Sequence, residues 1–323
     1  VTGSGVDATA ILDGFTITGG FGLTQTQQFN GGGMNNLSGS PTLTNVIFTE
    51  NNGSFGGGMY NYASSPTLVN VTFHDNWAAG GGGVYNDSSS SPTITDTTFI
   101  DNTALISGGG MENANGSHPT LSNVLFSGNI GDSNFATGGG MMNTLSNPTL
   151  TNVTFSDNFA VYQGGAMYNQ NSSPILTNVT FFSNYTAVNG GAIASTSSQS
   201  NPVVINSIFW GNLPDQVYVE ASATTTITYS VVQGGWAGTG NLDLDPLLGP
   251  LADNGGFNFT HALYPGSPAI DAGDPANCPA TDQRGFPRPL DGDGLNGPRC
   301  DMGAYEAELK VFDFSIYLPM IVR

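Results

Sequence analysis

A repeat of 25 to 29 residues runs through most of this chain and restricts its fold more than any other feature. Its clearest mark is a phenylalanine that returns once in each copy, at Phe48, Phe73, Phe99, Phe126, Phe155, Phe181 and Phe209. An Asn or Asp stands three residues before each of these positions, an Asn stands three residues after it, and a Gly-rich step precedes an apolar residue. Internal periods of this length are typical of solenoids, propellers and other repeat arrays.

The residues within one copy indicate short strands. Leu150, Val153 and Phe155 are separated by polar residues, which is strand alternation with a one-residue corner at Asn152. The copy is shorter than the roughly 40 residues of a propeller blade, and three short strands with three turns fit its length. We therefore predict an all-β fold: a right-handed parallel β-helix followed by a small C-terminal domain rich in Pro, Gly and Asp.

In such a coil, equivalent residues of successive turns lie about 4.8 Å apart. Phe is then expected to stack on Phe, and the corner Asn side chains are expected to pass amide hydrogen bonds along their column. Eight or nine turns predict a rod of roughly 40 Å. Because one turn cannot bury its apolar face alone, the architecture accounts for nearly every repeated residue before any function is considered.

The period stops near residue 240, which predicts a β-helix over 1–240, a second domain over 241–308 and a C-terminal strand over 309–323. Four stretches of the second domain are DPLLGPLADNGG (245–256), HALYPGSPAIDAG (261–273), TDQRGFPRP (281–289) and CDMGAYE (300–306). They resemble the "choice-of-anchor Q" domain, which follows β-helix repeats in bacterial surface and secreted proteins. The resemblance implies export and display at the cell surface, and it supplies no active site.

The charge distribution excludes several classes of partner. The formal net charge is −19, only 9% of the residues are charged, and the first 283 residues contain no Lys or Arg. Binding of nucleic acid through its phosphates is therefore not expected, and neither is attraction to anionic lipid. No apolar run reaches the roughly 18 to 20 residues that span a bilayer.

The two cysteines and the first residue bear on location. Cys278 and Cys300 have no further Cys or His cluster beside them, which favours a disulfide formed in an oxidising compartment, and hence an extracellular or cell-surface protein. The sequence opens at Val1 without a signal peptide, so a mature form or a fragment is implied.

The β-helix offers one weak pair of candidate catalytic residues. Asp75 and Asp101 occupy the same column on consecutive turns, at a spacing compatible with the two carboxylates of a glycoside hydrolase. The competing interpretation is a solvated turn position. Enzymes of this fold that act on polyuronates need Lys or Arg near the substrate, and their absence from the solenoid argues against that chemistry.

A second column holds Tyr60, Tyr85, Glu112, Met142 and Tyr168. Its tyrosines predict either an exposed strip on which sugars stack or side chains that merely suit a strand. In the C-terminal domain, Asp291, Asp293 and Asn296 resemble the start of a calcium loop, although the distal Glu of a complete loop is missing. The alternative is an acidic surface loop closed by the disulfide. Calcium is the one cofactor that the sequence suggests.

The function expected from these features is structural. We predict an extracellular surface protein, adhesive or fibre-forming, that associates with itself through the solenoid ends and the strand at 311–323. That strand either lies on its own solenoid or adds to a neighbouring subunit. The alternative is a protein that binds or cleaves a neutral polysaccharide, such as a cell-surface glycan.

Overall fold

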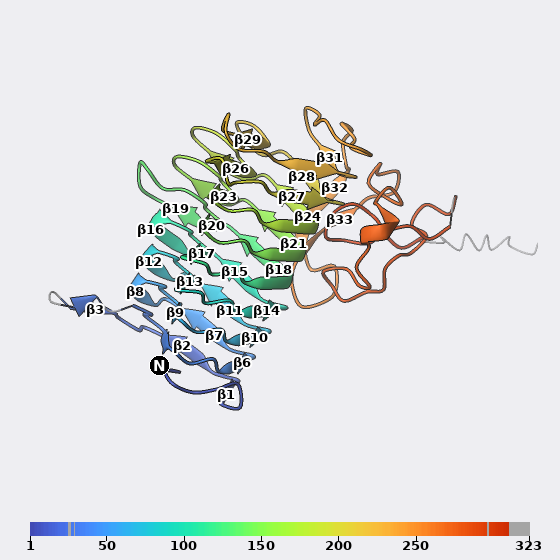
Figure 1. The fold of residues 1–323 in the computed structure, drawn as a ribbon. Helices are drawn as coiled ribbons and strands as arrows, with labels where there is room; N and C mark the ends of the chain where they lie inside the picture. Colours follow the sequence, from blue (N-terminus) through green and yellow to red (C-terminus); the bar gives the residue numbers. More distant parts are fainter. Residues whose placement is uncertain (25–26, 29, 296, 310–323) are drawn as a thin grey trace, which may run out of the picture.

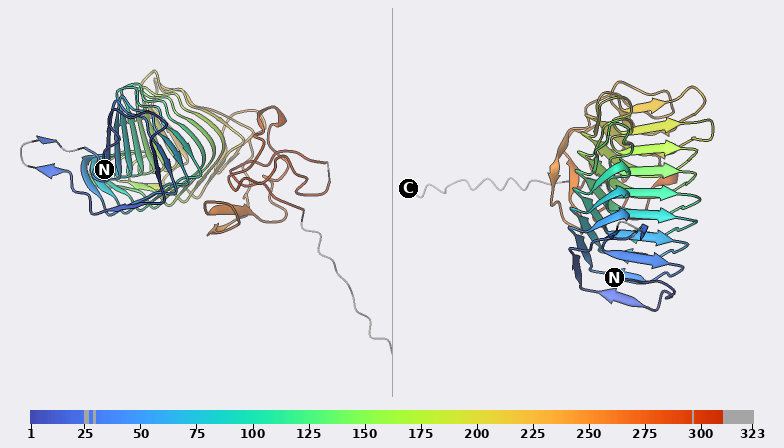
Figure 2. Two further views of the ribbon diagram at one scale, coloured as in Figure 1. Left: turned by 90° about the horizontal axis from the view of Figure 1, so that it is seen from below. Right: turned by 90° about the vertical axis from the view of Figure 1, so that its left-hand side faces the viewer.

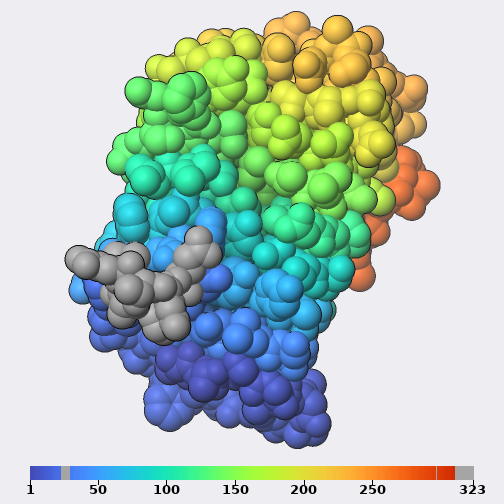
Figure 3. All heavy atoms as spheres, turned by 60° about the vertical axis from the view of Figure 1, so that its left-hand side comes forward, coloured from blue at the N-terminus to red at the C-terminus, as the bar shows by residue number. Residues whose placement is uncertain are grey.

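The computed structural model describes residues 1–24, 27–28, 30–295 and 297–309. Its main body is a parallel β-solenoid in which each turn adds a strand to each of three faces (Figures 1 and 2). The turns follow one another along the axis in sequence order, so the surface is layered from the first turn to the last (Figure 3). The all-β prediction is thus confirmed. Asn296 and the strand predicted at 311–323 lie outside the described residues.

Three sheets form the faces of the solenoid. Sheet A has eight strands: β5 (Met34–Leu37), β9 (Met59–Tyr62), β13 (Val84–Asp87), β17 (Met111–Ala114), β20 (Met141–Thr144), β23 (Met167–Gln170), β26 (Ile193–Thr196) and β29 (Val217–Val219). Sheet C has six: β8 (Asn52–Phe55), β12 (Trp77–Gly80), β16 (Thr103–Ser107), β19 (Ile130–Gly131), β22 (Phe159–Ala160) and β25 (Tyr185–Thr186).

Sheet B has fifteen strands because it is bent along its length into two lines. The first line contains β1 (Ile11–Asp13), β6 (Thr42–Thr44), β10 (Thr67–Val69), β14 (Thr93–Thr95), β27 (Val203–Ile205) and β30 (Thr226–Thr228). The second contains β2 (Thr16–Thr18), β7 (Ile47–Thr49), β11 (Thr72–His74), β15 (Thr98–Ile100), β28 (Ile208–Trp210) and β31 (Val231–Val232). Three longer strands cross the bend and belong to both lines: β18 (Thr120–Ser127), β21 (Thr149–Ser156) and β24 (Ile175–Phe182).

The predicted phenylalanine column lies at the centre of the core. Successive strands pair in register, so that Phe73 faces Phe99 directly. The rings of neighbouring turns stack with centroids 4.6 to 5.1 Å apart, and all seven are fully buried. Ile17 continues the column in the first turn by pairing with Phe48. The spacing of the rings follows directly from the spacing of the strands.

Two buried asparagine ladders accompany the phenylalanines. In the first, formed by the Asn three residues after each phenylalanine, each amide nitrogen donates to the side-chain oxygen of the next Asn at 2.8 to 3.0 Å, from Asn51 to Asn212. The ladder that we predicted at the corner Asn residues forms only in part: Asn70 donates to Asn45 at 2.7 Å, whereas Asn178 donates to the backbone oxygen of Asp301. A second ladder runs from Asn36 to Asn169 with bonds of 2.8 to 2.9 Å. These bonds give the buried amides the partners that burial requires. The repeat contains the second ladder as an Asn two residues after the apolar residue of every Gly-rich step except the last, where Ser195 stands. Our sequence analysis missed this signal.

The bend in sheet B falls at the Asn or Asp three residues before each phenylalanine. Asn70 and Asn152 both have φ of 54°, a left-handed conformation that Asn tolerates better than most residues. At the last residue of the Gly-rich step the chain passes close to the phenylalanine stack, and this residue is Gly in five turns and Ala in two, at Ala166 and Ala192. A Cβ at Gly58 would lie 2.6 Å from the Phe73 ring.

The residues after the last turn form a C-terminal module, which we define as 244–309. It contains an antiparallel pair, β32 (Leu248–Ala252) and β33 (Thr260–Leu263), and a short 3-10 helix, η1 (Pro275–Asn277). The predicted disulfide between Cys278 and Cys300 is present. A further antiparallel pair, β3 (Leu23–Thr24) with β4 (Gln27–Gln28), projects from the first turn.

The module packs against the flank of the solenoid and not across its end (Figure 2). Thr154 of β21 donates to Gln283 at 2.6 Å, Asn178 of β24 donates to the backbone oxygen of Asp301 at 2.8 Å, and His261 lies 3.1 Å from the Ser156 hydroxyl. These outward side chains are consequently buried. The end of the solenoid is covered instead by the chain around Trp236, which packs against the core. None of the described residues forms a helix with the length and apolar character that a membrane crossing requires.

Candidate functional site

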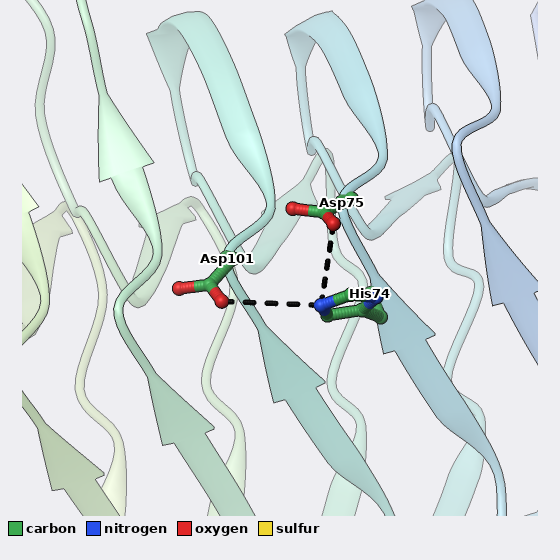
Figure 4. Close-up of side chains that lie close together, drawn as sticks. All are labelled: His74, Asp75 and Asp101. Carbon is green, nitrogen blue, oxygen red and sulfur yellow. Dashed lines mark ion pairs between the residues drawn. The ribbon is translucent and has the colours of Figure 1, made fainter.

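The two candidate catalytic carboxylates lie side by side on an outer corner of the solenoid, together with a histidine (Figure 4). His74 ends β11, and Asp75 and Asp101 follow β11 and β15 in the left-handed conformation, with φ of 52° and 53°. The His74 Nε2 atom lies 3.2 Å from Asp75 Oδ2 and 3.9 Å from Asp101 Oδ2. The sequence pattern placed the two carboxylates together, but it did not identify His74 as their neighbour.

The exposure of this corner speaks against a hydrolytic site. The side chains of Asp75 and Asp101 are 51% and 56% exposed. Partial burial raises the pKa of Asp101, the neighbouring Asp75 charge adds to that rise, and His74 opposes it. Neither carboxylate lines the cavities found beside sheet A, at the end of the solenoid or in the module. A polysaccharide cleaved here would have no enclosing surface to hold it.

A second candidate is the column of outward residues on sheet A. Register places Tyr60, Tyr85 and Glu112 on consecutive strands, and Met142 and Tyr168 on the next two. Of the two alternatives for this column, the exposed strip does not hold for most of it, because Tyr60, Glu112, Met142 and Tyr168 are each at most 8% exposed. The chain entering sheet A from sheet C packs against the column, as the 3.4 Å contact of the Thr137 hydroxyl with the Met142 sulfur shows.

Glu112 is the one carboxylate of the described solenoid (residues 1–24, 27–28 and 30–240) that is buried. Its Oε2 accepts a hydrogen bond of 2.6 Å from the Ser107 hydroxyl. Gly80 leaves room for the carboxyl, since a Cβ there would lie 2.6 Å from Oε2. Burial raises the pKa of Glu112 to about 7, while the Ser107 hydrogen bond opposes the rise and the Asp87 charge adds to it. Glu112 is therefore largely protonated in mildly acidic solution.

A polar cavity of about 310 Å³ lies further along the same face. Its lining combines aromatic, amide, hydroxyl and carboxylate groups: Tyr162, Gln163, Tyr168, Gln170, Thr196, Ser197, Tyr218 and Glu220. The Tyr168 hydroxyl lies 2.9 Å from that of Thr196, and Glu220 accepts a 2.7 Å bond from the Ser197 backbone. Aromatic faces beside a few fixed polar groups are typical of small-molecule binding sites.

The predicted calcium loop gains an acidic residue that the sequence analysis did not include. Carboxylate oxygens of Asp271, Asp291 and Asp293 lie within 4.8 Å of one another. Asp271 is buried, and it accepts backbone hydrogen bonds from Gly292 and Asp293 at 3.1 and 3.0 Å. Burial raises the pKa of Asp271. An all-oxygen set of this kind suits calcium, and calcium binding here stays a prediction.

Comparison with known proteins identifies the family from the repeats. The family model described as "Right handed beta helix region" matches residues 7–147 and 106–243, which together cover more than half of the chain. The chain belongs to the right-handed β-helix family. No curated protein and no solved structure gives a match.

Membership of the β-helix family accounts for the repeat, but it assigns no functional site. The match ends at residue 243, before the C-terminal module. The structure brings the predicted Asp75 and Asp101 together on the β-helix, and it brings Asp291 and Asp293 together in the module. His74, Asp271 and the burial of Glu112 are what sequence reasoning missed. Of these, His74 had a visible signal, because it directly precedes an Asp of the acidic column.

Proposed function

We propose that this β-helix is an extracellular structural or adhesive protein, displayed at the cell surface, whose solenoid serves as a scaffold. The observation that carries the proposal is that the repeated residues are used in packing. The Phe column is fully buried, and both Asn columns bond along the axis. Repetition of this kind stabilises a rod through neighbouring turns and needs no ligand. The disulfide between Cys278 and Cys300 supports an oxidising compartment.

The module stiffens this scaffold by tying several turns together along the flank. Asn152 and Asn178, on consecutive turns, donate to the backbone oxygens of Thr281 and Asp301 at 2.8 Å each. Within the module, Arg284 pairs with Asp282 at 2.7 Å, and both side chains are buried. Removing one partner of a buried ion pair is strongly destabilising. The module is therefore a firmly fixed attachment point, as a surface-anchored rod requires.

The proposal includes end-to-end self-association, which the first turn supports. Ile11, Phe15 and Phe21 of the first turn are 66%, 57% and 69% exposed. Exposed apolar side chains of this size favour association with another chain. The other end of the solenoid is covered by the chain around Trp236. We therefore propose that residues 311–323 supply the strand that pairs with the first turn of a second chain.

Electron microscopy of the purified full chain, together with size-exclusion chromatography, tests self-association. We expect linear assemblies of the wild type, and single particles when residues 311–323 are deleted or when Phe15 is replaced by Ser. Phe135→Ser is the matched control, since Phe135 is 80% exposed and lies midway along the solenoid. A wild type that is monomeric at all concentrations, or polymers that persist after the deletion, would contradict the proposal.

The cavity beside Tyr168 and Tyr218 favours binding of a neutral glycan as a second candidate function. The first 283 residues supply no Lys or Arg to hold an acidic sugar, so an uncharged one fits this face. On a glycan array, binding to neutral oligosaccharides should be weakened by Tyr218→Ala and unaffected by Tyr185→Ala, which changes a tyrosine on sheet C. Binding confined to acidic glycans, or equal loss in both variants, would count against this function.

A further inference from the structure

We propose that His74, Asp75 and Asp101 form a binding site for a divalent transition-metal ion such as Zn²⁺, which links two consecutive turns of the solenoid. The site differs in chemistry from the oxygen-only loop in the module, because one ligand is an imidazole nitrogen. Imidazole favours Zn²⁺ and its neighbours in the first transition row, whereas sites built only from oxygen ligands suit Ca²⁺ and Mg²⁺.

The distances fit one ion with small side-chain adjustments. His74 Nε2 lies 3.2 and 3.9 Å from the nearest oxygens of Asp75 and Asp101, and the three ligand atoms all lie within 4.8 Å of one another. An ion bound about 2.0 to 2.2 Å from each ligand bridges atoms up to roughly 4 Å apart. All three side chains are 41% to 56% exposed, so they can rotate by the remaining fraction of an ångström. Water would complete the coordination.

The backbone holds the three ligands in place without a metal. Asp75 N donates to the Ile100 oxygen at 3.2 Å, and Asp101 N donates to the Ser127 oxygen at 3.0 Å, so both corners belong to the hydrogen-bonded stack. On the next turn, Gly128 leaves the space that the Asp101 carboxylate uses, because a Cβ there would overlap Asp101 Oδ1. Because the backbone at these corners is fixed before binding, only the side-chain torsions of the ligands lose freedom when the ion arrives.

The charge of the corner also favours a cation. Glu50 precedes Asp75 in the same column, so three consecutive turns each carry an exposed carboxylate. Among residues 1–283 no Lys or Arg is available to neutralise them, which leaves His74 as the one basic side chain at this corner. Like charges on neighbouring turns repel each other, and a bound divalent ion removes that repulsion. This is the physical reason for a metal here and not merely a surface ion pair.

Isothermal titration calorimetry of the full chain with ZnCl₂ is the primary test. We expect one Zn²⁺ bound at this site per chain, and at least about tenfold weaker binding in His74→Ala and in Asp101→Asn, since even indirect disturbance of a metal ligand costs 10- to 100-fold. Asp157→Asn is the matched control, because Asp157 lies in the same column two turns further on, where Gly128 and Ser183 occupy the neighbouring turns and supply no second carboxylate. CaCl₂ at equal concentration should not displace the Zn²⁺.

Histidine NMR gives a second, independent readout. The chain has three histidines, and Zn²⁺ should shift or broaden the ring signals of His74 while those of His118 and His261 stay unchanged. The melting temperature should rise in Zn²⁺ for the wild type and for Asp157→Asn, but not for His74→Ala. Unshifted His74 signals, equal Zn²⁺ affinity in wild type and His74→Ala, or displacement by equimolar Ca²⁺ would each overturn the proposal.

Discussion

Replacing the buried Glu112 by Gln should stabilise the protein in neutral and mildly alkaline solution while leaving it nearly unchanged at pH 4.5. Glu112 is 8% exposed, and its carboxyl accepts the Ser107 hydrogen bond. A Gln side chain has the same shape and can still accept that bond. The variant differs from the wild type mainly in that position 112 can no longer ionise. Its effect on stability must therefore depend on pH.

The magnitude follows from the raised pKa. Glu112 has a pKa of about 7 in the folded protein, against an ordinary value of 4.5. Between these values the native state keeps the proton and the unfolded state releases it, so stability falls as the pH rises and levels off above about pH 7. At roughly 1.4 kcal/mol per pH unit, the wild type loses roughly 3 kcal/mol from this group. At roughly 2 °C per kcal/mol for a chain of this size, Glu112→Gln should melt about 6 °C higher at pH 8.

Urea unfolding followed by circular dichroism, for wild type and variant at pH 4.5 and pH 8, measures the effect. Because other buried carboxyls also titrate, the quantity to compare is the difference in the free energy of unfolding between wild type and variant at each pH. Glu50→Gln is the control, because Glu50 is exposed and its substitution should leave that difference near zero. A Glu112→Gln effect that is equal at both pH values, or a variant that is less stable at pH 8, would refute the reasoning.

Three further predictions concern the core, the disulfide and the calcium loop. Phe126→Ala should lower the free energy of unfolding by about 3 to 5 kcal/mol in urea titrations, and a loss below about 1 kcal/mol would show that the stack is not close-packed. Cys278→Ser should cost about 3 kcal/mol by the same assay, from the 22 residues that separate the cysteines; unchanged stability would contradict this. Millimolar CaCl₂ should raise the melting temperature of the wild type but not of Asp293→Asn, and the absence of both heat and a melting shift would exclude calcium there.

The core was predictable because it repeats. One phenylalanine in every turn fixes the register of its neighbours, so a period in the sequence becomes a column in space, as for Phe73 and Phe99. The same logic placed Asp75 beside Asp101. The second Asn ladder could have been found in this way too, since Asn61 and Asn86 follow their apolar residues at a constant distance.

Contacts made outside the repeat could not be predicted. Thr151 and Thr154 look alike in the sequence, yet Thr154 is fully buried because Gln283, 129 residues further on, docks against it. Strand alternation likewise marks Glu112 as outward, which is correct, but outward does not mean exposed where Ser107 packs over it. Alternation determines which side of a sheet a residue occupies, whereas burial depends on what else covers that side.

Hydrogen exchange measured peptide by peptide on the native full chain tests most directly whether solenoid and module form one scaffold. Segments joined by buried hydrogen bonds should open together. The account predicts that β18, β21 and β24 exchange most slowly and that the module residues around Gln283 and Asp301 share their protection. Exchange of those module residues long before the three strands would show that the module is only loosely attached and would contradict a single continuous scaffold.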